Sequence, residues 1–217
     1  MAETTEIPVR LSIPSGYAEL PLDDIASTVD VTRRLVDELG TPAQRQAGEF
    51  VFSSLYVFLS ALAERNALYC GIGRHLSALN GQLITSSLVV TLMDFPGSRN
   101  PRLVLRDVLV GKARAHEAGQ ADIVDLPDGP VAFFEHTLLL PNPAIPGQHT
   151  LAAGAEVPVW QLEAFVPSSD GSRLIAIELS TPFAEHGPQY RAMVVAMAGG
   201  IDFDPPAEDD PLAALLG

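Results

Sequence analysis

The chain of 217 residues contains few of the residues that form disulfides, metal sites and charged binding sites. Cys70 is its one cysteine, so the sequence excludes an internal disulfide and a cysteine-based zinc site. Aromatic residues make up 6% of the chain and charged residues 18%. Because Cys70 lies in an apolar alternating segment, we expect it to be a small buried side chain rather than a reactive thiol.

Long hydrophobic runs are also absent. The longest apolar run, residues 55–63, is broken by Ser60 and is too short to span a bilayer. The first six residues contain two acids and no apolar segment, which predicts neither a secretory signal nor a lipoprotein leader. With 47% hydrophobic residues, the composition predicts a soluble globular protein, and we expect it in the cytoplasm.

Basic residues are scarce, and lysine is almost missing. The net charge is −14, and twelve of the thirteen basic residues are arginine. An acidic chain repels phosphate groups, so we expect neither nucleic acid nor an anionic membrane as a partner. The arginine bias and abundant alanine indicate a bacterial, actinobacterial-like composition. A helical arrangement spreads the one candidate basic patch over a solvated face: Arg99, Arg102, Arg106, Lys112 and Arg114.

Catalytic and cofactor motifs are not found in the sequence. It has no Gly-x-Ser-x-Gly elbow, no phosphate-binding Gly-rich loop before Lys-Ser/Thr, and no Gly-x-Gly-x-x-Gly. The five histidines lie in separate segments. Glu135 and His136 are neighbours on a predicted strand and point to opposite faces, so they cannot chelate one ion together. We expect His136 in the core or at a sheet edge and His186 exposed, and we expect no catalytic residue, metal or cofactor.

Alternation and turn residues predict most of the architecture. Apolar positions with a helical period predict helices near residues 25–39, 42–65 and 101–116, and a last one ending at Gly199-Gly200. A capping box at residues 41–44 begins the second helix, whose segment 50–59 is apolar nearly all round and is expected to be buried on two sides. Three predicted hairpins turn at Asn80-Gly81, Asp128-Gly129 and Asp170-Gly171, and residues 9–13 form a short first strand.

Two groups of residues are candidates for binding a partner. Glu135, Gln161 and Glu163 could share one face of a sheet if their strands are adjacent; we expect a solvated acidic face rather than an acid–base pair or cation site. The tail 204–217 is acidic and proline-containing, so we predict a disordered tail after a single domain of residues 1–203. If helical, the tail places Leu212, Leu215 and Leu216 on one face, which fits either a solvated stub or a docking peptide.

The order of these elements resembles the Mog1/PsbP-like fold. The residues that carry the resemblance are the opening segment 9–17, Val-Arg-Leu-Ser-Ile-Pro-Ser-Gly-Tyr, and the closing segment 177–182, Ile-Glu-Leu-Ser-Thr-Pro, with its helix ending in Ile-Asp-Phe. The resemblance implies an α+β protein in which an antiparallel sheet of six to seven strands is covered by helices on both faces. Members are mainly non-catalytic interaction proteins, and the bacterial lipoproteins among them have a lipobox cysteine that this sequence lacks near its start.

Two functions are compatible with this pattern. The first is a non-enzymatic cytoplasmic binding or accessory protein that holds a protein partner through a sheet face, the 141–156 loop or the acidic tail. The second is a small-molecule carrier or cyclase of the helix-grip (START-like) type, with an apolar cavity beneath its C-terminal helix. The predicted third helix between strands, which a helix-grip fold normally lacks, favours the first.

Overall fold

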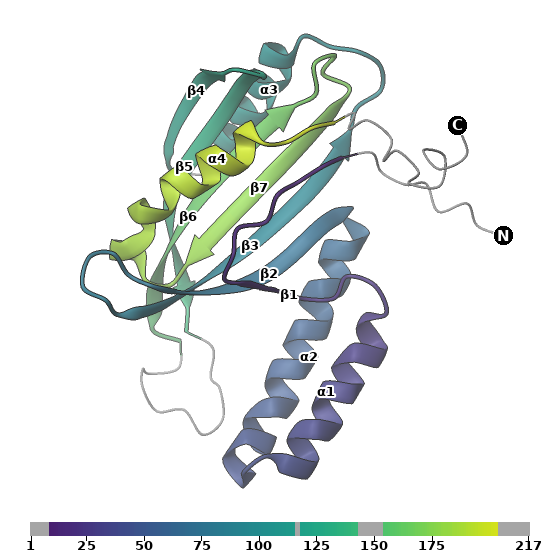
Figure 1. Ribbon diagram of the computed structural model, residues 1–217, viewed down its shortest axis with the longest axis vertical. Coiled ribbons are helices and arrows are strands. Elements are labelled where there is room, and N and C mark those ends of the chain that lie inside the picture. The colour runs from purple at the N-terminus through teal and green to yellow at the C-terminus, as the bar shows by residue number, and fades with distance from the viewer. Residues whose placement is uncertain (1–8, 116–117, 143–153, 204–217) are drawn as a thin grey trace, which may run out of the picture.

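Seven antiparallel strands form one sheet in the computed structural model, which describes residues 9–115, 118–142 and 154–203 (Figure 1). The strands are β1 (Tyr17–Glu19), β2 (Ala67–Leu76), β3 (Leu83–Asp94), β4 (Gln120–Leu126), β5 (Gly129–Pro141), β6 (Glu156–Pro167) and β7 (Arg173–Thr181). The helices are α1 (Ile25–Leu39), α2 (Pro42–Glu64), α3 (Pro101–Arg114), the 3-10 helix η1 (Ala184–Tyr190) and α4 (Arg191–Gly199). The order of the strands across the sheet is β1-β2-β3-β7-β6-β5-β4.

Helices cover both faces of this sheet, which confirms the predicted α+β class. On one face, η1 and α4 pack over β6 and β7 and close the largest core, which contains Trp160, Leu162, Ile177, Val194 and Met197. We call this the α4 face. On the opposite face, which we call the α2–α3 face, two smaller cores lie side by side. Helix α2 covers the β2–β3 side, and α3 covers the β5–β6 side.

The local signals for turns and helix ends are mostly confirmed. The Thr41 hydroxyl accepts a hydrogen bond from the Gln44 amide at 3.3 Å, and the Gln44 side chain accepts the Thr41 amide at 2.8 Å, as a capping box requires. All three predicted hairpins are present. Cys70 is buried against Leu59 of α2, as expected.

Two predictions at the chain ends are wrong. Residues 9–13 form no strand, because only Arg10 finds a backbone partner, in a single bridge with Asp202; the segment instead packs its apolar side chains against the main core. The last helix ends at Gly199-Gly200 as predicted, but without the left-handed glycine that such an end implies, since Gly200 has φ −103° and its amide donates to the Met197 carbonyl.

The expectation that segment 50–59 is buried on two sides is also wrong. Figure 1 shows α1 and α2 as a hairpin that projects beyond the β1–β2 side of the sheet. Helix α1 covers one side of α2, burying Gly48 and Phe52, while Leu59 of α2 reaches the sheet. The remaining side faces solvent, so that Val57 is 67% exposed and Phe50 and Phe58 are exposed as well.

Candidate functional site

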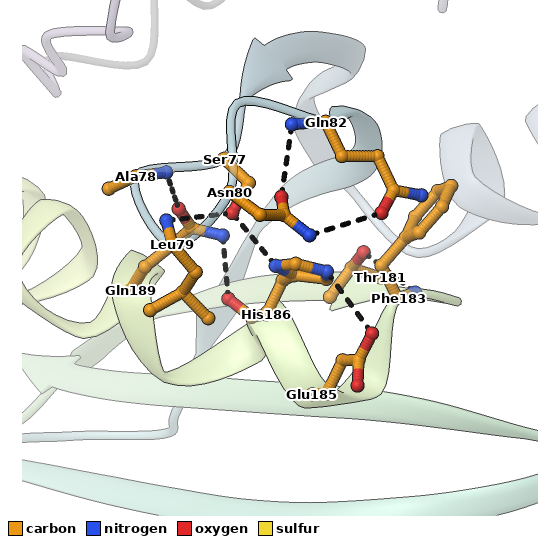
Figure 2. Close-up of polar contacts among 10 residues, drawn as sticks. All are labelled: Ser77, Ala78, Leu79, Asn80, Gln82, Thr181, Phe183, Glu185, His186 and Gln189. Carbon is orange, nitrogen blue, oxygen red and sulfur yellow. Dashed lines mark hydrogen bonds and ion pairs between the residues drawn. The ribbon is translucent and has the colours of Figure 1, made fainter.

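A serine, a histidine and a glutamate meet where the β2–β3 turn contacts η1 (Figure 2). The Ser77 hydroxyl lies 2.8 Å from His186 Nδ1, and His186 Nε2 lies 3.3 Å from a Glu185 carboxylate oxygen. The three side chains are those of a hydrolase triad. Ser77 is, however, only 3% exposed and its oxygen already accepts the Leu79 amide at 3.1 Å, so a substrate carbonyl has no path to it.

This cluster therefore fastens η1 to the β2–β3 turn. Gln189 adds to it, because its carbonyl oxygen accepts the Ala78 amide at 3.0 Å while its amino group donates to the His186 carbonyl at 2.9 Å. His186 is 2% exposed, which corrects the expectation of an exposed histidine. The neighbouring Gly187-Pro188 suggested a surface turn, but η1 lies flat on the sheet.

The structure separates the predicted site residues. Leu212, Leu215 and Leu216 lie outside the described residues, as does most of the 141–156 loop. Glu135 is opposite Leu162 and so lies on the α4 face, where it accepts the Trp160 indole N–H at 2.9 Å and pairs with Arg191 at 2.6 Å. Side chains alternate between the two faces along a strand, so Gln161 and Glu163, the neighbours of Leu162 on β6, lie on the opposite face from Leu162 and Glu135.

Gln161 and Glu163 lie on the α2–α3 face, and the expectation that they are solvated is wrong. Both are buried, and the Gln161 amide nitrogen donates to a Glu163 carboxylate oxygen at 3.4 Å. The register places Gln161 opposite Ser180 and Glu163 opposite Glu178 on the neighbouring strand β7. Two polar rows thus cross the middle of this face between the α2 and α3 cores.

Lys112, the single lysine of the chain, reaches these rows from α3. Its ammonium group lies 2.5 Å from a Glu163 carboxylate oxygen and 4.8 Å and 5.6 Å from the centroids of the Phe134 and Phe165 rings. Aromatic faces attract a cation, so the rings help to hold the ammonium group in place. The sequence spread the candidate basic residues over a solvated face, and Arg99, Arg102 and Arg106 are exposed there and pair with Asp107 or Asp125. Lys112 points inward instead, which corrects the expectation for that residue.

Glu178 has a distinct electrostatic environment. Burial raises the pKa of its carboxyl group above the ordinary value, and repulsion from the Glu163 carboxylate adds to this effect. Lys112, a hydrogen bond from Ser180 and the charge of Arg65 act in the opposite direction. A cation bound beside the Glu178 carboxyl group would favour its ionised form.

A groove of about 590 Å³ opens above these polar rows. Its apolar walls come from α2 and β2 on one side and from β5 and β6 on the other, and its floor includes Gln161, Glu178 and Ser180. The apolar wall residues are Phe58, Leu62, Ile72, Leu138, Leu140 and Val159. A concave apolar site with a few convergent polar groups is the usual form of a ligand site.

A second apolar surface lies on the α1–α2 hairpin. Phe50 and Val57 are seven residues apart and so lie on one outward stripe of α2. Near the tip, Leu35 and Leu39 of α1 face Val51 of α2 across a shallow apolar groove of about 450 Å³. Exposed apolar patches of this kind mark interaction surfaces in soluble proteins.

By length and composition alone, helix α2 is long and apolar enough to cross a membrane, and the window that meets this criterion is 11% buried in the protein. Among the described residues, no group of three or more His, Cys, Asp or Glu side chains is placed to hold a metal ion.

No family model matches the chain, and a comparison with curated proteins finds no match. The two surfaces, the α2–α3 groove and the α1–α2 hairpin, are therefore the features from which function can be inferred. The sequence pointed to Gln161 and Glu163, named Lys112 only as part of the candidate basic patch, and missed Glu178. A signal was present in each case: Glu178 interrupts the apolar strand 174–179, and Lys112 follows Val108 and Leu109 on the inward side of α3.

Proposed function

We propose that this protein is a non-enzymatic binding protein that holds a protein partner on the α1–α2 hairpin. The observation that carries the proposal is the exposure of large apolar side chains along a helix that the sequence alone would bury. Val57, Phe50 and Leu39 together expose an apolar surface that the hairpin itself leaves uncovered. Keeping such a surface in water is unfavourable, at roughly 25 cal/mol per Å² of apolar area, and a partner would remove that cost.

The charge of the chain narrows the chemistry of the partner. At a net charge of −14, two copies of this protein repel each other, and so does an anionic bilayer. A basic protein that presents an apolar helix is attracted instead, and complementary charge raises its association rate. The occupant we propose is therefore a different protein with a basic rim around an apolar helical face, met in the cytoplasm.

Membership of the Mog1/PsbP-like fold group is part of the same proposal, because interaction rather than catalysis is the common role in that group. The helix-grip alternative has less support. It needs a cavity beneath the C-terminal helix, whereas Val194, Met197 and Ala198 of α4 are buried in the main core.

Site-specific photo-crosslinking tests the hairpin. Benzoylphenylalanine replaces Val57 in one variant and Leu79, which is 68% exposed on the β2–β3 turn, in the matched control. We expect the Val57 probe to give a heteromeric adduct whose partner is identified by mass spectrometry, and the Leu79 probe to give none. The purified partner should bind the wild type and Leu79→Glu but not Val57→Glu.

Three outcomes would overturn the proposal. The Val57 probe could give no adduct, or the same adducts as the Leu79 probe, or an adduct with the mass of two copies of this chain. In the last case the hairpin is a self-association surface, and light scattering would show a dimer that Val57→Glu dissociates.

A further inference from the structure

The groove on the α2–α3 face differs in kind from the hairpin surface. The hairpin surface is apolar and includes only a shallow apolar groove, whereas the groove on the α2–α3 face has apolar walls and ends on a polar floor. Its volume of about 590 Å³ is in the range of small-molecule sites, roughly 300–1,000 Å³. Phe50 and Val57 do not line it.

The polar floor is unfavourable for stability. Burying a polar side chain or an ion pair in a sheet face is at best neutral compared with well-packed apolar residues. Here Gln161 and Glu163 are buried together, and Glu178 and Ser180 lie directly opposite them on β7. Stability alone therefore does not explain these polar side chains at the base of an open groove.

The charges of the floor are not balanced. Two carboxylates, Glu163 and Glu178, face each other across β6 and β7, while Lys112 contacts Glu163. Arg65 is exposed at the groove rim, where water screens its charge. Glu178 therefore lies beside a carboxylate whose charge Lys112 already offsets, and it faces the groove with one negative charge to neutralise.

We propose that the groove binds a small amphipathic amine, with its ammonium group on Glu178 and its apolar body between Phe58 and Leu138. The Glu178 carboxylate accepts from the ammonium group, and the Ser180 hydroxyl and Gln161 carbonyl lie on the same floor as further acceptors. A hydrogen bond between two charged groups is about twice as strong as a neutral one. A fatty acid anion of the same length is repelled by the carboxylates.

Isothermal titration calorimetry with three probes of equal chain length tests the charge preference. The probes are octylamine, 1-octanol and octanoate, the two ionic ones below their micellar concentrations and the alcohol below its solubility limit, each titrated into the full chain. We expect octylamine to bind about tenfold or more tightly than 1-octanol, and octanoate to bind more weakly than either.

Two substitutions locate the amine. Glu178→Gln should weaken octylamine binding about tenfold and leave 1-octanol binding unchanged. The control, Asp122→Asn, removes an exposed carboxylate of β4 and should change neither. Thermal unfolding of each variant establishes that it is folded. Leu138→Trp, which fills the groove, should abolish binding of both probes.

The proposal is overturned if the three probes bind equally, if no probe binds, or if Glu178→Gln binds octylamine as tightly as the wild type does. It is independent of the proposed protein partner, because Val57 does not line the groove and Val57→Glu is expected to leave amine binding unchanged. Loss of amine binding with retained partner binding would remove this inference alone.

Discussion

Gly187 packs against the indole ring of Trp160 so closely that a Cβ atom on it would lie 2.2 Å from the ring. Trp160 in turn donates its indole N–H to Glu135, and Glu135 pairs with Arg191 at the start of α4. The Trp160 ring on β6 thus holds η1 by packing against Gly187. It holds α4 through the Glu135 carboxylate, which pairs with Arg191. This chain of contacts sets the height of η1 and α4 above the sheet.

Gly187→Ala is expected to destabilise the protein by about 1–3 kcal/mol, because neither the ring nor the η1 backbone can move away without losing contacts. Chemical denaturation measures the change. Gly199→Ala is the matched control: a Cβ there meets only Leu126 at 3.7 Å, so we expect a change between zero and about 1 kcal/mol in the stabilising direction. Equal destabilisation by both variants would contradict the close-contact argument.

The contact also explains why His186 was predicted wrongly. Gly-Pro beside a histidine is typical of a surface turn. Here glycine is required for close approach to Trp160, and that approach buries the histidine against Ser77. Both partners lie far away in the sequence, so no local pattern in segment 184–190 reveals them.

The pH dependence of stability tests the Glu135–Arg191 pair. Hydrogen bonds from Arg191, and to a smaller extent from Trp160, hold the pKa of Glu135 below its ordinary value against the effect of burial. The ionised form is thus favoured in the folded state, so its contribution is complete above pH 4.5, the ordinary value, and is lost as the pH falls through the lowered pKa.

Glu135→Gln should therefore be less stable than the wild type near neutral pH, by about 1 kcal/mol or less because the pair is partly exposed. The difference should shrink as the pH falls from 5 to 3. Urea denaturation at several pH values measures it. A difference that is constant over this range would show that Glu135 acts by packing rather than by charge.

Leu59 and Val57, two residues apart on α2, test which side of this helix is exposed to solvent. Leu59 is fully buried against Cys70, whereas Val57 is 67% exposed. We expect Leu59→Ala to lower the free energy of unfolding by about 2–5 kcal/mol and Val57→Ser to change it by about 0.5 kcal/mol or less. A large loss for Val57→Ser would mean that Val57 is covered in solution.

The sequence predicts the sheet, its hairpins and most of its helices, because each has a local signal: alternation, a glycine turn or a capping box. It does not predict the two surfaces. An apolar helix such as α2 is covered or bare depending on where its hairpin lies relative to the sheet. Likewise Glu163 and Glu178 become neighbours only through the pairing of β6 with β7 and its register. Both are properties of long-range packing.

Replacing Glu178 tests the electrostatics of the groove floor without any ligand. Burial and the facing Glu163 raise the pKa of Glu178, while Lys112, Ser180 and Arg65 oppose the shift. The unfolded chain therefore loses the Glu178 proton at a lower pH than the folded protein does. The folded state is accordingly penalised as the pH rises above the ordinary value of 4.5.

Glu178→Gln removes that penalty while keeping the size and hydrogen-bonding capacity of the side chain. The variant should gain stability relative to the wild type as the pH rises from 4 to 8. At pH 4 the free energies of unfolding of the two proteins should be similar. Chemical denaturation across this range measures the difference, with Asp122→Asn as the exposed control that shows no comparable trend. The opposite trend, in which Glu178→Gln loses stability relative to the wild type as the pH rises from 4 to 8, would contradict this expectation. It would show that a cation holds the Glu178 carboxylate in the folded protein and that the charges of the groove floor are balanced.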